Sequence, residues 1–171
     1  HMGEVRVVGE AARDFLSRVL TNDARKLGSG QGQYTLMCNE RGGVVDDLYA
    51  YCLAAREFLL VINASRIEAD LAWLQTQLQA FAGRGGVRLE SVSDYLSAVA
   101  VQGPRVAEFI DGCFAERATG GTTAARPSDL MKNQIAAFKM DGTVVWTART
   151  GYTGEDGFEL IRGWQNELEA L

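Results

Sequence analysis

Two adjacent aspartates, Asp46 and Asp47, lie inside the apolar segment 44–53, which has the composition of a strand. Aspartate is depleted from strands and is costly to bury without a partner. Adjacent strand residues point to opposite faces, so the two carboxylates cannot form a close catalytic dyad. One of them therefore needs a protein partner or a ligand. A strand-end aspartate that bonds the hairpin backbone is an equally compatible alternative.

A glycine-rich segment, 149–159, reads Arg-Thr-Gly-Tyr-Thr-Gly-Glu-Asp-Gly-Phe-Glu. Glycines at this spacing imply tight turns, or backbone brought close to another group. The acids lack the spacing of a calcium-binding EF-hand loop. Glu159, on the strand after the loop, has the chemistry to accept two parallel N–H bonds from a heterocycle. A surface turn with solvated acids is the commoner alternative.

An earlier glycine-rich segment, 28–32, has the composition of a phosphate-binding loop but not its context. Such loops follow a strand, precede a helix and usually include a lysine that reaches the phosphates. Here a predicted helix precedes, a predicted strand follows and no lysine is suitably placed. The pattern therefore favours an ordinary connection between two elements.

Composition excludes several classes of protein. The chain has 171 residues with 17 basic and 22 acidic side chains, a formal net charge of -5, whereas a nucleic-acid-binding surface needs clustered Lys and Arg. The only histidine is His1, which excludes Ser-His-Asp and Cys-His catalysis and histidine-based zinc hydrolysis within the fold. We expect neither a metal site nor a nucleic-acid partner.

The cysteines and the apolar runs bear on location. Cys38, Cys52 and Cys113 are an odd and widely spaced set, so we expect reduced thiols in a cytoplasmic compartment rather than a disulfide framework. The longest strongly apolar run, 58–62, is far shorter than the roughly 20 residues of a membrane-spanning helix. No signal-peptide pattern opens the sequence. We expect a cytoplasmic chain without membrane contact.

Periodicity predicts the elements of the first half of the chain. They are a strand at 5–8, a helix at 12–20, strands at 33–38, 44–53 and 57–62, a helix after residue 65, and a strand at 87–92. Ser65 and Glu68 have the spacing of a capping box for the second helix. The predicted buried stripe of that helix is Ile67, Leu71, Leu74, Leu78 and Phe81.

The second half repeats this order. We expect a strand at 97–101, a helix from Pro104, a loop at 115–128, a hairpin of strands 135–140 and 143–149 around Asp141-Gly142, a strand at 158–161, and an interrupted final helix. The predicted fold is α+β, with two similar lobes of mainly antiparallel sheet and flanking helices. Residues 1–92 form the first lobe and 93–171 the second, incomplete at its C-terminus. We expect more protein on both sides in the natural chain.

Four segments, read together, resemble the glycine cleavage system T-protein family of tetrahydrofolate-dependent aminomethyltransferases. They are 34–48, which includes Gly-Gly-Val-Val-Asp-Asp, then 61–65, 101–104 and 149–159. The segments follow the family's order with similar spacing, and the resemblance covers nearly the whole chain. The opening His-Met-Gly-Glu is also similar to the family's Ser-His-Met-Gly.

The resemblance implies transfer of the methylene carbon from the aminomethyl-lipoyl arm of the H-protein to tetrahydrofolate, with release of ammonia. It implies that Asp47, the second aspartate of the Gly-Gly-x-x-Asp-Asp motif, is the catalytic carboxylate. It also implies that Glu159 binds the pterin edge, and no metal is involved. The other folate-binding residues expected from the matching segments are Tyr34, Asn63, Arg149 and Tyr152.

The sequence also departs from the family. The family's long C-terminal part, with a Gly-Ala-Arg-Asp motif and a barrel-like domain, is absent, so we expect a truncated chain with weak folate binding and no turnover. A folate-dependent demethylase and the folate domain of a sarcosine- or dimethylglycine-oxidising enzyme are alternatives with another donor. A third alternative is a non-catalytic folate-binding protein, although the Lys-Gly-Cys-Tyr-x-Gly-Gln motif of one such group is missing.

Overall fold

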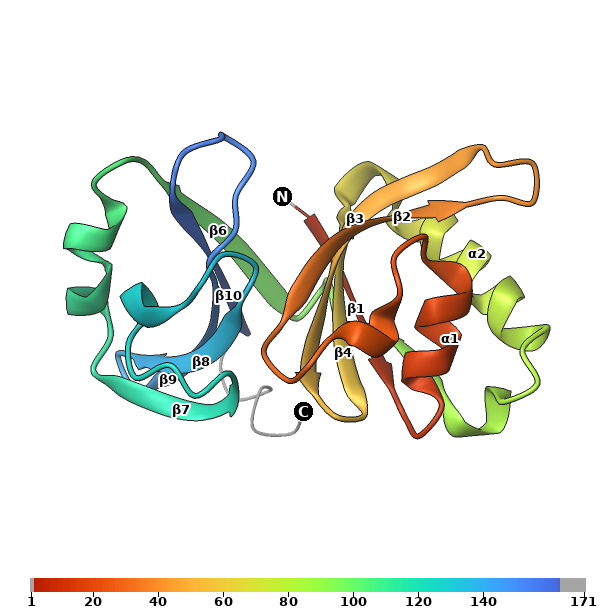
Figure 1. Cartoon of the computed structure of the whole chain (residues 1–171), viewed down its shortest axis with the longest axis horizontal. Coiled ribbons are helices and arrows are strands. Elements are labelled where there is room, and N and C mark those ends of the chain that lie inside the picture. The colour runs from red at the N-terminus through yellow and green to blue at the C-terminus, as the bar shows by residue number, and fades with distance from the viewer. Residues whose placement is uncertain (1, 164–171) are drawn as a thin grey trace. The chain divides into compact units, whose positions relative to one another are not determined.

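The computed structural model describes residues 2–163 and contains two antiparallel five-stranded sheets (Figure 1). The chain forms two compact units, one made of residues 1–28 and 32–94, the other of residues 29–31 and 95–171. Each unit holds one of the sheets. The predicted α+β class with mainly antiparallel sheets is confirmed. The predicted final helix lies outside the described residues.

The first unit has a sheet in the order β2-β3-β4-β1-β5. Its strands are β1 (Met2–Val8), β2 (Gly32–Cys38), β3 (Val44–Ala54), β4 (Glu57–Asn63) and β5 (Arg88–Ser91). Two helices, α1 (Ala12–Val19) and α2 (Ile67–Gln79), cover one face of this sheet (Figure 1). The connecting 3-10 turns are η1 (Ala24–Lys26), η2 (Ala64–Arg66) and η3 (Arg84–Gly86).

Alternating apolar residues of the strands form the core of this unit with the inner faces of α1 and α2. Because strand residues alternate between faces, Leu48, Ala50 and Cys52 of β3 share the face that packs on the helices. Phe15 and Leu16 of α1 and Leu74 of α2 supply the helical side. The buried cluster also contains Val5, Val7, Met37, Phe58, Leu60 and Ile62.

The start of α2 differs from the prediction. The segment after β4 first makes the turn η2, so the helix begins at Ile67, with Arg66 at its N-cap and no side-chain cap. The predicted capping box of Ser65 and Glu68 therefore does not form. The predicted apolar stripe does pack against the core, but Asp70 lies within it and is completely buried.

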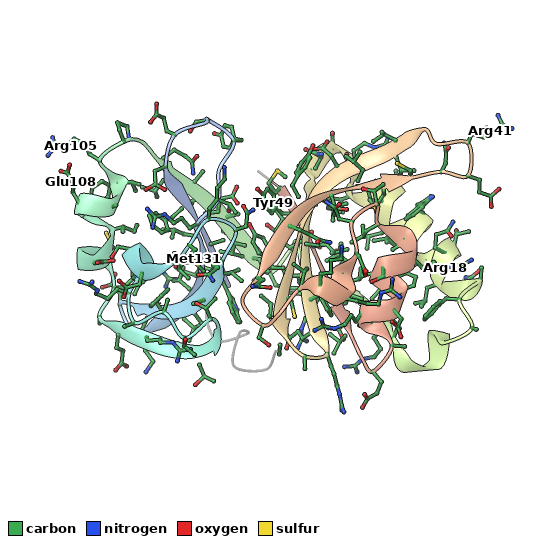
Figure 2. The ribbon with its side chains drawn as sticks, viewed as in Figure 1. Arg18, Arg41, Tyr49, Arg105, Glu108 and Met131 are labelled. Carbon is green, nitrogen blue, oxygen red and sulfur yellow. The ribbon has the colours of Figure 1, made fainter. Side chains whose placement is uncertain are left out.

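The hairpin between β2 and β3 is closed by Asn39. Its Oδ1 accepts the amide protons of Arg41 at 3.0 Å and Gly43 at 2.9 Å, and Gly42 has a φ of +79°, which favours glycine. Arg41 lies at the tip of the hairpin (Figure 2). The turn sets the register in which Leu36 pairs with Asp47, so it determines which face each aspartate occupies.

The second unit has a sheet in the order β6-β10-β9-β8-β7. Its strands are β6 (Leu96–Gln102), β7 (Glu116–Gly121), β8 (Ile135–Met140), β9 (Thr143–Ala148) and β10 (Gly157–Gly163). The predicted hairpin is confirmed, because Asp141 and Gly142 join β8 to β9 with φ values of +49° and +75°, as a type I′ turn requires. The 3-10 turns are η4 (Val106–Glu108), η5 (Ile110–Cys113) and η6 (Pro127–Asp129).

Two predicted elements of this unit are wrong. The segment after Pro104 makes the turns η4 and η5 instead of a helix, since only Val106 and Ile110 are buried while Phe109 is 53% exposed. So short a segment, with Gly112 inside it, lacks the packing that stabilises a helix. Part of the predicted 115–128 loop is the strand β7, whose pairing with β8 shifts register before Gly121.

The segment 29–31 belongs to the second unit although it precedes β2 in the chain. The Gly30 carbonyl oxygen accepts the Ile135 amide proton at 2.8 Å, and Gln31 forms a bridge with Gln134. Gly30 has a φ of +78°, and a Cβ there would collide with the backbone of Thr122. This glycine-rich segment therefore acts as a connection that pairs with the second sheet.

Candidate functional site

Asp47 lies on the face of the first sheet opposite the helices, where its carboxylate is held by two neighbours. The Tyr34 hydroxyl donates to Asp47 Oδ2 at 2.9 Å. The Asn63 side-chain amide donates to the Asp47 carbonyl oxygen at 3.1 Å and approaches its Oδ1 at 3.4 Å. β2 supplies the tyrosine, β3 the aspartate and β4 the asparagine. The structure thus brings together three of the predicted site residues.

Three tyrosines continue this face beside Asp47. The rings of Tyr34 and Tyr49 meet edge to face with centroids 5.8 Å apart, and those of Tyr49 and Tyr51 stack at 5.6 Å with 15° between their planes. Tyr34 is 51% exposed. Its hydrogen bond to the Asp47 carboxylate raises the pKa of the Tyr34 hydroxyl, so this hydroxyl stays protonated and continues to donate. The arrangement offers an aromatic surface beside a carboxylate.

Asp46 points the other way, toward the helices, and is only 7% exposed. Its Oδ1 accepts from the Asn63 side-chain amide at 2.9 Å, and its Oδ2 accepts from the Asn63 backbone amide at 3.2 Å. Burial opposes ionisation, but hydrogen bonds from Asp70 and Asn63 outweigh it and leave the pKa of Asp46 below its ordinary value. The partner of the buried Asp46 carboxylate is therefore the end of β4 rather than the hairpin backbone.

Asp70 on α2 was not identified as a site residue from the sequence. It is completely buried, and burial, followed by the adjacent Asp46, raises the pKa of its carboxyl to about 7. The signal that could have found it is a carboxylate between Ile67 and Leu74, at the i+3 and i+4 spacings of the apolar stripe. A charged residue inside such a stripe needs a partner in the core.

Glu159 lies in the middle of β10 in the second unit, paired with Ala148 and Ala100 on the neighbouring strands. Small side chains flank it on both sides, which leaves space around its carboxylate. The Thr150 hydroxyl, which is buried, donates to Glu159 Oε2. The loop that precedes β10 thus orients the carboxylate that the sequence assigns to the pterin edge.

Arg149 joins its own loop to the segment around η6. Its Nε and Nη2 donate to the two oxygens of Asp156 at 3.0 and 2.6 Å, and Nη1 donates to the carbonyl oxygens of Ser128 and Leu130 at 2.9 and 2.8 Å. The guanidinium also lies 5.4 Å from the centre of the Phe158 ring. Hydrogen bonds from Arg149 hold the pKa of Asp156 below its ordinary value. Through these contacts Arg149 stabilises the conformation of the glycine-rich loop.

Gln102, at the end of β6, organises the same loop and was missed as a site residue. Its Nε2 donates to the Thr150 carbonyl oxygen at 3.0 Å, and its Oε1 accepts from the Thr153 hydroxyl at 3.1 Å. A Cβ on Gly151 or Gly157 would collide with the Gln102 side chain. The absence of side chains on these two glycines lets the loop close around the Gln102 amide.

Two further features bear on function. Tyr152, at the tip of the loop, is 82% exposed, so it contributes little to the loop's own packing. A hollow in the first unit is lined by residues of α1, α2 and the β2–β3 hairpin, including Arg18, Arg41 and Trp73, and by none of the predicted site residues. Within residues 2–163, no three His, Cys, Asp or Glu side chains gather as metal ligands, and no helix there is long and apolar enough to cross a membrane.

Comparison with known families identifies the chain. The GCVT N-terminal domain family matches residues 1–170. The chain belongs to this family. The resemblance found in the four sequence segments is thereby confirmed.

This GCVT N-terminal domain is similar to curated aminomethyltransferases. It is 43% identical over 161 residues to that of a Thermus thermophilus strain, covering 94% of this chain and 42% of the relative. It is 42% identical over 160 residues to that of Bacillus pumilus, covering 94% of this chain and 40% of the relative. The chain thus spans less than half the length of these relatives.

Solved structures agree on the fold. The glycine cleavage system aminomethyltransferase T from Bartonella henselae superposes with a TM-score of 0.78 and 32% identity over 95% of this chain and 40% of that one. The heterotetrameric sarcosine oxidase from Corynebacterium sp. U-96 gives a TM-score of 0.60 at 16% identity, over 95% of this chain and 71% of that one. The second likeness shows a shared fold alone.

Proposed function

We propose that this GCVT N-terminal domain supplies the folate-binding residues and the catalytic carboxylate of an aminomethyltransferase. The reaction is transfer of the methylene carbon from the aminomethyl-lipoyl arm of the H-protein to tetrahydrofolate, with release of ammonia. The observation that carries the proposal is the Asp47 carboxylate, which lies on a tyrosine-lined sheet face between the Tyr34 hydroxyl and the Asn63 amide. The names of the relatives support the reaction.

In this proposal Asp47 acts as an acceptor and as a fixed negative charge. Tetrahydrofolate, when bound, supplies the amine nitrogens that receive the one-carbon unit. The carboxylate accepts a hydrogen bond from an amine N–H and stabilises positive charge that develops beside it. Tyr34 and Asn63 restrict the carboxylate to one orientation through their hydrogen bonds. Positioning of this kind accounts for a large part of a transfer rate without a covalent enzyme intermediate.

The second unit supplies the residues for the pterin ring. A pterin offers an amino group and a ring N–H side by side, which one carboxylate accepts together, as it does from a guanidinium. Glu159 has that capacity, and its bond from Thr150 fixes the carboxylate plane. Arg149 contributes by bracing the loop through Asp156. Tyr152, exposed at the loop tip, offers an aromatic face to the same ligand.

The proposal extends to partners and location. A lipoylated H-protein is the proposed donor, as the family's reaction requires, and the cytoplasm is the proposed compartment. Free thiols at Cys38, Cys52 and Cys113 agree with a reducing compartment. No metal is needed, because the proposed chemistry uses carboxylates and hydrogen-bond donors only.

Calorimetric titration of the chain with tetrahydrofolate tests the folate assignment. Glu159→Ala is expected to weaken binding by roughly 10- to 100-fold, because two charge-assisted hydrogen bonds are lost. The matched control is Glu155→Ala, an acid of the same loop that is exposed and lacks a proposed ligand contact. Equal affinity in the Glu159 variant and in the unaltered chain, both folded, would refute the pterin assignment.

Catalysis is tested in an aminomethyltransferase that contains this chain and has the full length of the curated relatives. Asp47→Asn keeps the shape of the side chain but removes its charge. We expect transfer to fall by about 100-fold or more, with a smaller change in tetrahydrofolate affinity. Asp14→Asn, at an exposed position on α1, is the control. Methylene transfer that survives Asp47→Asn intact would exclude Asp47 as the catalytic carboxylate.

A further inference from the structure

The carboxyl group of Asp70 has no use in the chemistry described so far. It is completely buried on the inner face of α2, and neither of its oxygens has an N–H or hydroxyl donor among residues 2–163. Its carboxyl group is close enough to that of Asp46 for each to influence the pKa of the other. Burial of a polar group without a donor costs free energy, and an apolar residue at this position would extend the stripe of α2 without that cost.

The hydrogen bonds of Asp46 decide which of the two groups carries the proton. An ionised carboxylate only accepts hydrogen bonds, so a bond between two carboxyl groups requires one proton. Asp46 accepts two N–H groups of Asn63, one on each oxygen, which favours its ionised form. Asp70 lacks such donors and therefore holds the proton. The pKa values follow this assignment, being raised in Asp70 by burial and lowered in Asp46.

Asn63 joins this buried pair to the proposed catalytic carboxylate. Its side-chain amide has two protons. It donates to Asp46 Oδ1 at 2.9 Å and also toward Asp47, to the carbonyl oxygen at 3.1 Å and Oδ1 at 3.4 Å. The amide thus connects aspartates that point to opposite faces of β3. Both protons are used by the aspartates, which leaves the Asn63 side-chain oxygen as the group that can accept from a ligand.

We propose that Asp70 is a positioning residue, whose neutral carboxyl group donates to Asp46 and so fixes the Asn63 amide against Asp47. The inference deepens the proposed function, on which its consequence for folate rests. In this arrangement Asp70 influences Asp47 indirectly, through Asp46 and Asn63. If the Asn63 side-chain amide were turned over, its oxygen would face the carboxylates of Asp46 and Asp47. The ionised Asp46 accepts hydrogen bonds only and therefore excludes this orientation.

The test compares three variants of the chain by NMR. Asp70→Asn retains a donor toward Asp46, whereas Asp70→Ala removes it. Leu74→Ala is the matched control, because Leu74 lies one turn along α2, is equally buried and has no group that can donate a hydrogen bond to Asp46. The readouts are the side-chain amide signals of Asn63, the carboxyl-carbon signals of Asp46, Asp47 and Asp70 against pH, and the affinity for tetrahydrofolate.

We expect Asp70→Ala to shift the Asn63 amide signals and to weaken tetrahydrofolate binding by about tenfold, the factor for one charge-assisted hydrogen bond. Asp70→Asn should restore both to within about twofold of the unaltered chain, since the donor is restored. In the unaltered chain the Asp70 carbon should titrate near pH 7, under the influence of Asp46 on β3 and Arg66 before α2. The Asn63 signals should change little in Leu74→Ala.

Two results would overturn the inference. One is an unchanged set of Asn63 amide signals in Asp70→Ala. The other is an equal change in Leu74→Ala, which would show that any loss of core packing has the same effect. If the unaltered chain fails to bind tetrahydrofolate, the proposed function fails for this chain, while the Asn63 signals still decide whether Asp70 positions the amide.

Discussion

Substitution of Asp70 by asparagine should change how the stability of the first unit depends on pH. The pKa of the Asp70 carboxyl rises from 3.8 to about 7 on folding, through burial and the adjacent Asp46. Between these values the folded chain holds a proton that the unfolded chain has released, so stability falls as pH increases. This loss is complete once the pH exceeds the folded pKa. Asparagine does not titrate, and therefore the variant lacks this contribution.

The magnitude follows from the size of the shift. A rise of roughly three pH units corresponds to at most ~4 kcal/mol of unfolding free energy. The pKa of Asp46 lies below its ordinary value, so Asp46 is ionised above pH 4.5 and does not alter the change, which amounts to about 3 kcal/mol between pH 4.5 and pH 7.5. The unaltered chain should therefore lose about 3 kcal/mol of unfolding free energy relative to Asp70→Asn as the pH rises from 4.5 to 7.5.

Urea unfolding at several pH values measures this difference. Methyl NMR signals of Leu48 and Leu60, which are buried in the first unit, report that unit alone. Burial also raises the pKa of Glu4 to about 7, but this contribution is present in both proteins and cancels in the comparison. A difference in unfolding free energy that stays constant over this pH range would refute the protonation assigned to Asp70.

Two further outcomes concern the glycine-rich loop of the second unit. Gly151→Ala should destabilise this loop by about 1–3 kcal/mol, because the new Cβ displaces the end of the Gln102 side chain and breaks its two hydrogen bonds to the loop; amide hydrogen exchange in the loop measures it. Gly85→Ala, which has open space around it, is the neutral control. Arg149→Lys should speed exchange in the same loop by about tenfold or more, since an ammonium group cannot reproduce the paired bonds to Asp156; exchange as slow as in the unaltered chain would contradict the bracing role.

The sequence predicts the opposite directions of the two aspartates but not their roles. Strand alternation alone requires that Asp46 and Asp47 point to different faces. Which face lies under the helices depends on how α1 and α2 pack, which is a tertiary property. The choice of Asp47 came from resemblance to a family, and the structure supports it by giving Asp46 a buried partner in Asn63.

The buried pair was missed because its members are distant in the sequence. Asp70 lies 24 positions after Asp46, so no local pattern links the two. The predicted stripe of α2 had the correct apolar residues but did not include Asp70. The predicted capping box does not form because the turn η2 places Arg66, rather than Ser65, at the N-cap of the helix.

The helix predicted after Pro104 does not form because its segment buries too few side chains. The segment after Pro104 has helical spacing, yet it buries only two large side chains and contains Gly112. Local propensity did not compensate, and two 3-10 turns form instead. The hairpin at Asp141 was predicted correctly because its turn chemistry is local and requires no distant partner.

The segment 29–31 bears on the order in which the two sheets fold. During synthesis the strands β1 to β5 are all made by residue 91, so the first sheet can complete itself while the carbonyl oxygen of Gly30 still lacks the amide of Ile135. When the second sheet forms, residues 29–31 are already held at both ends by the first unit. This lowers the conformational entropy lost when Gly30 pairs with Ile135. A polypeptide started at residue 95 would lack this piece, and its β8 would fold without the bond to Gly30.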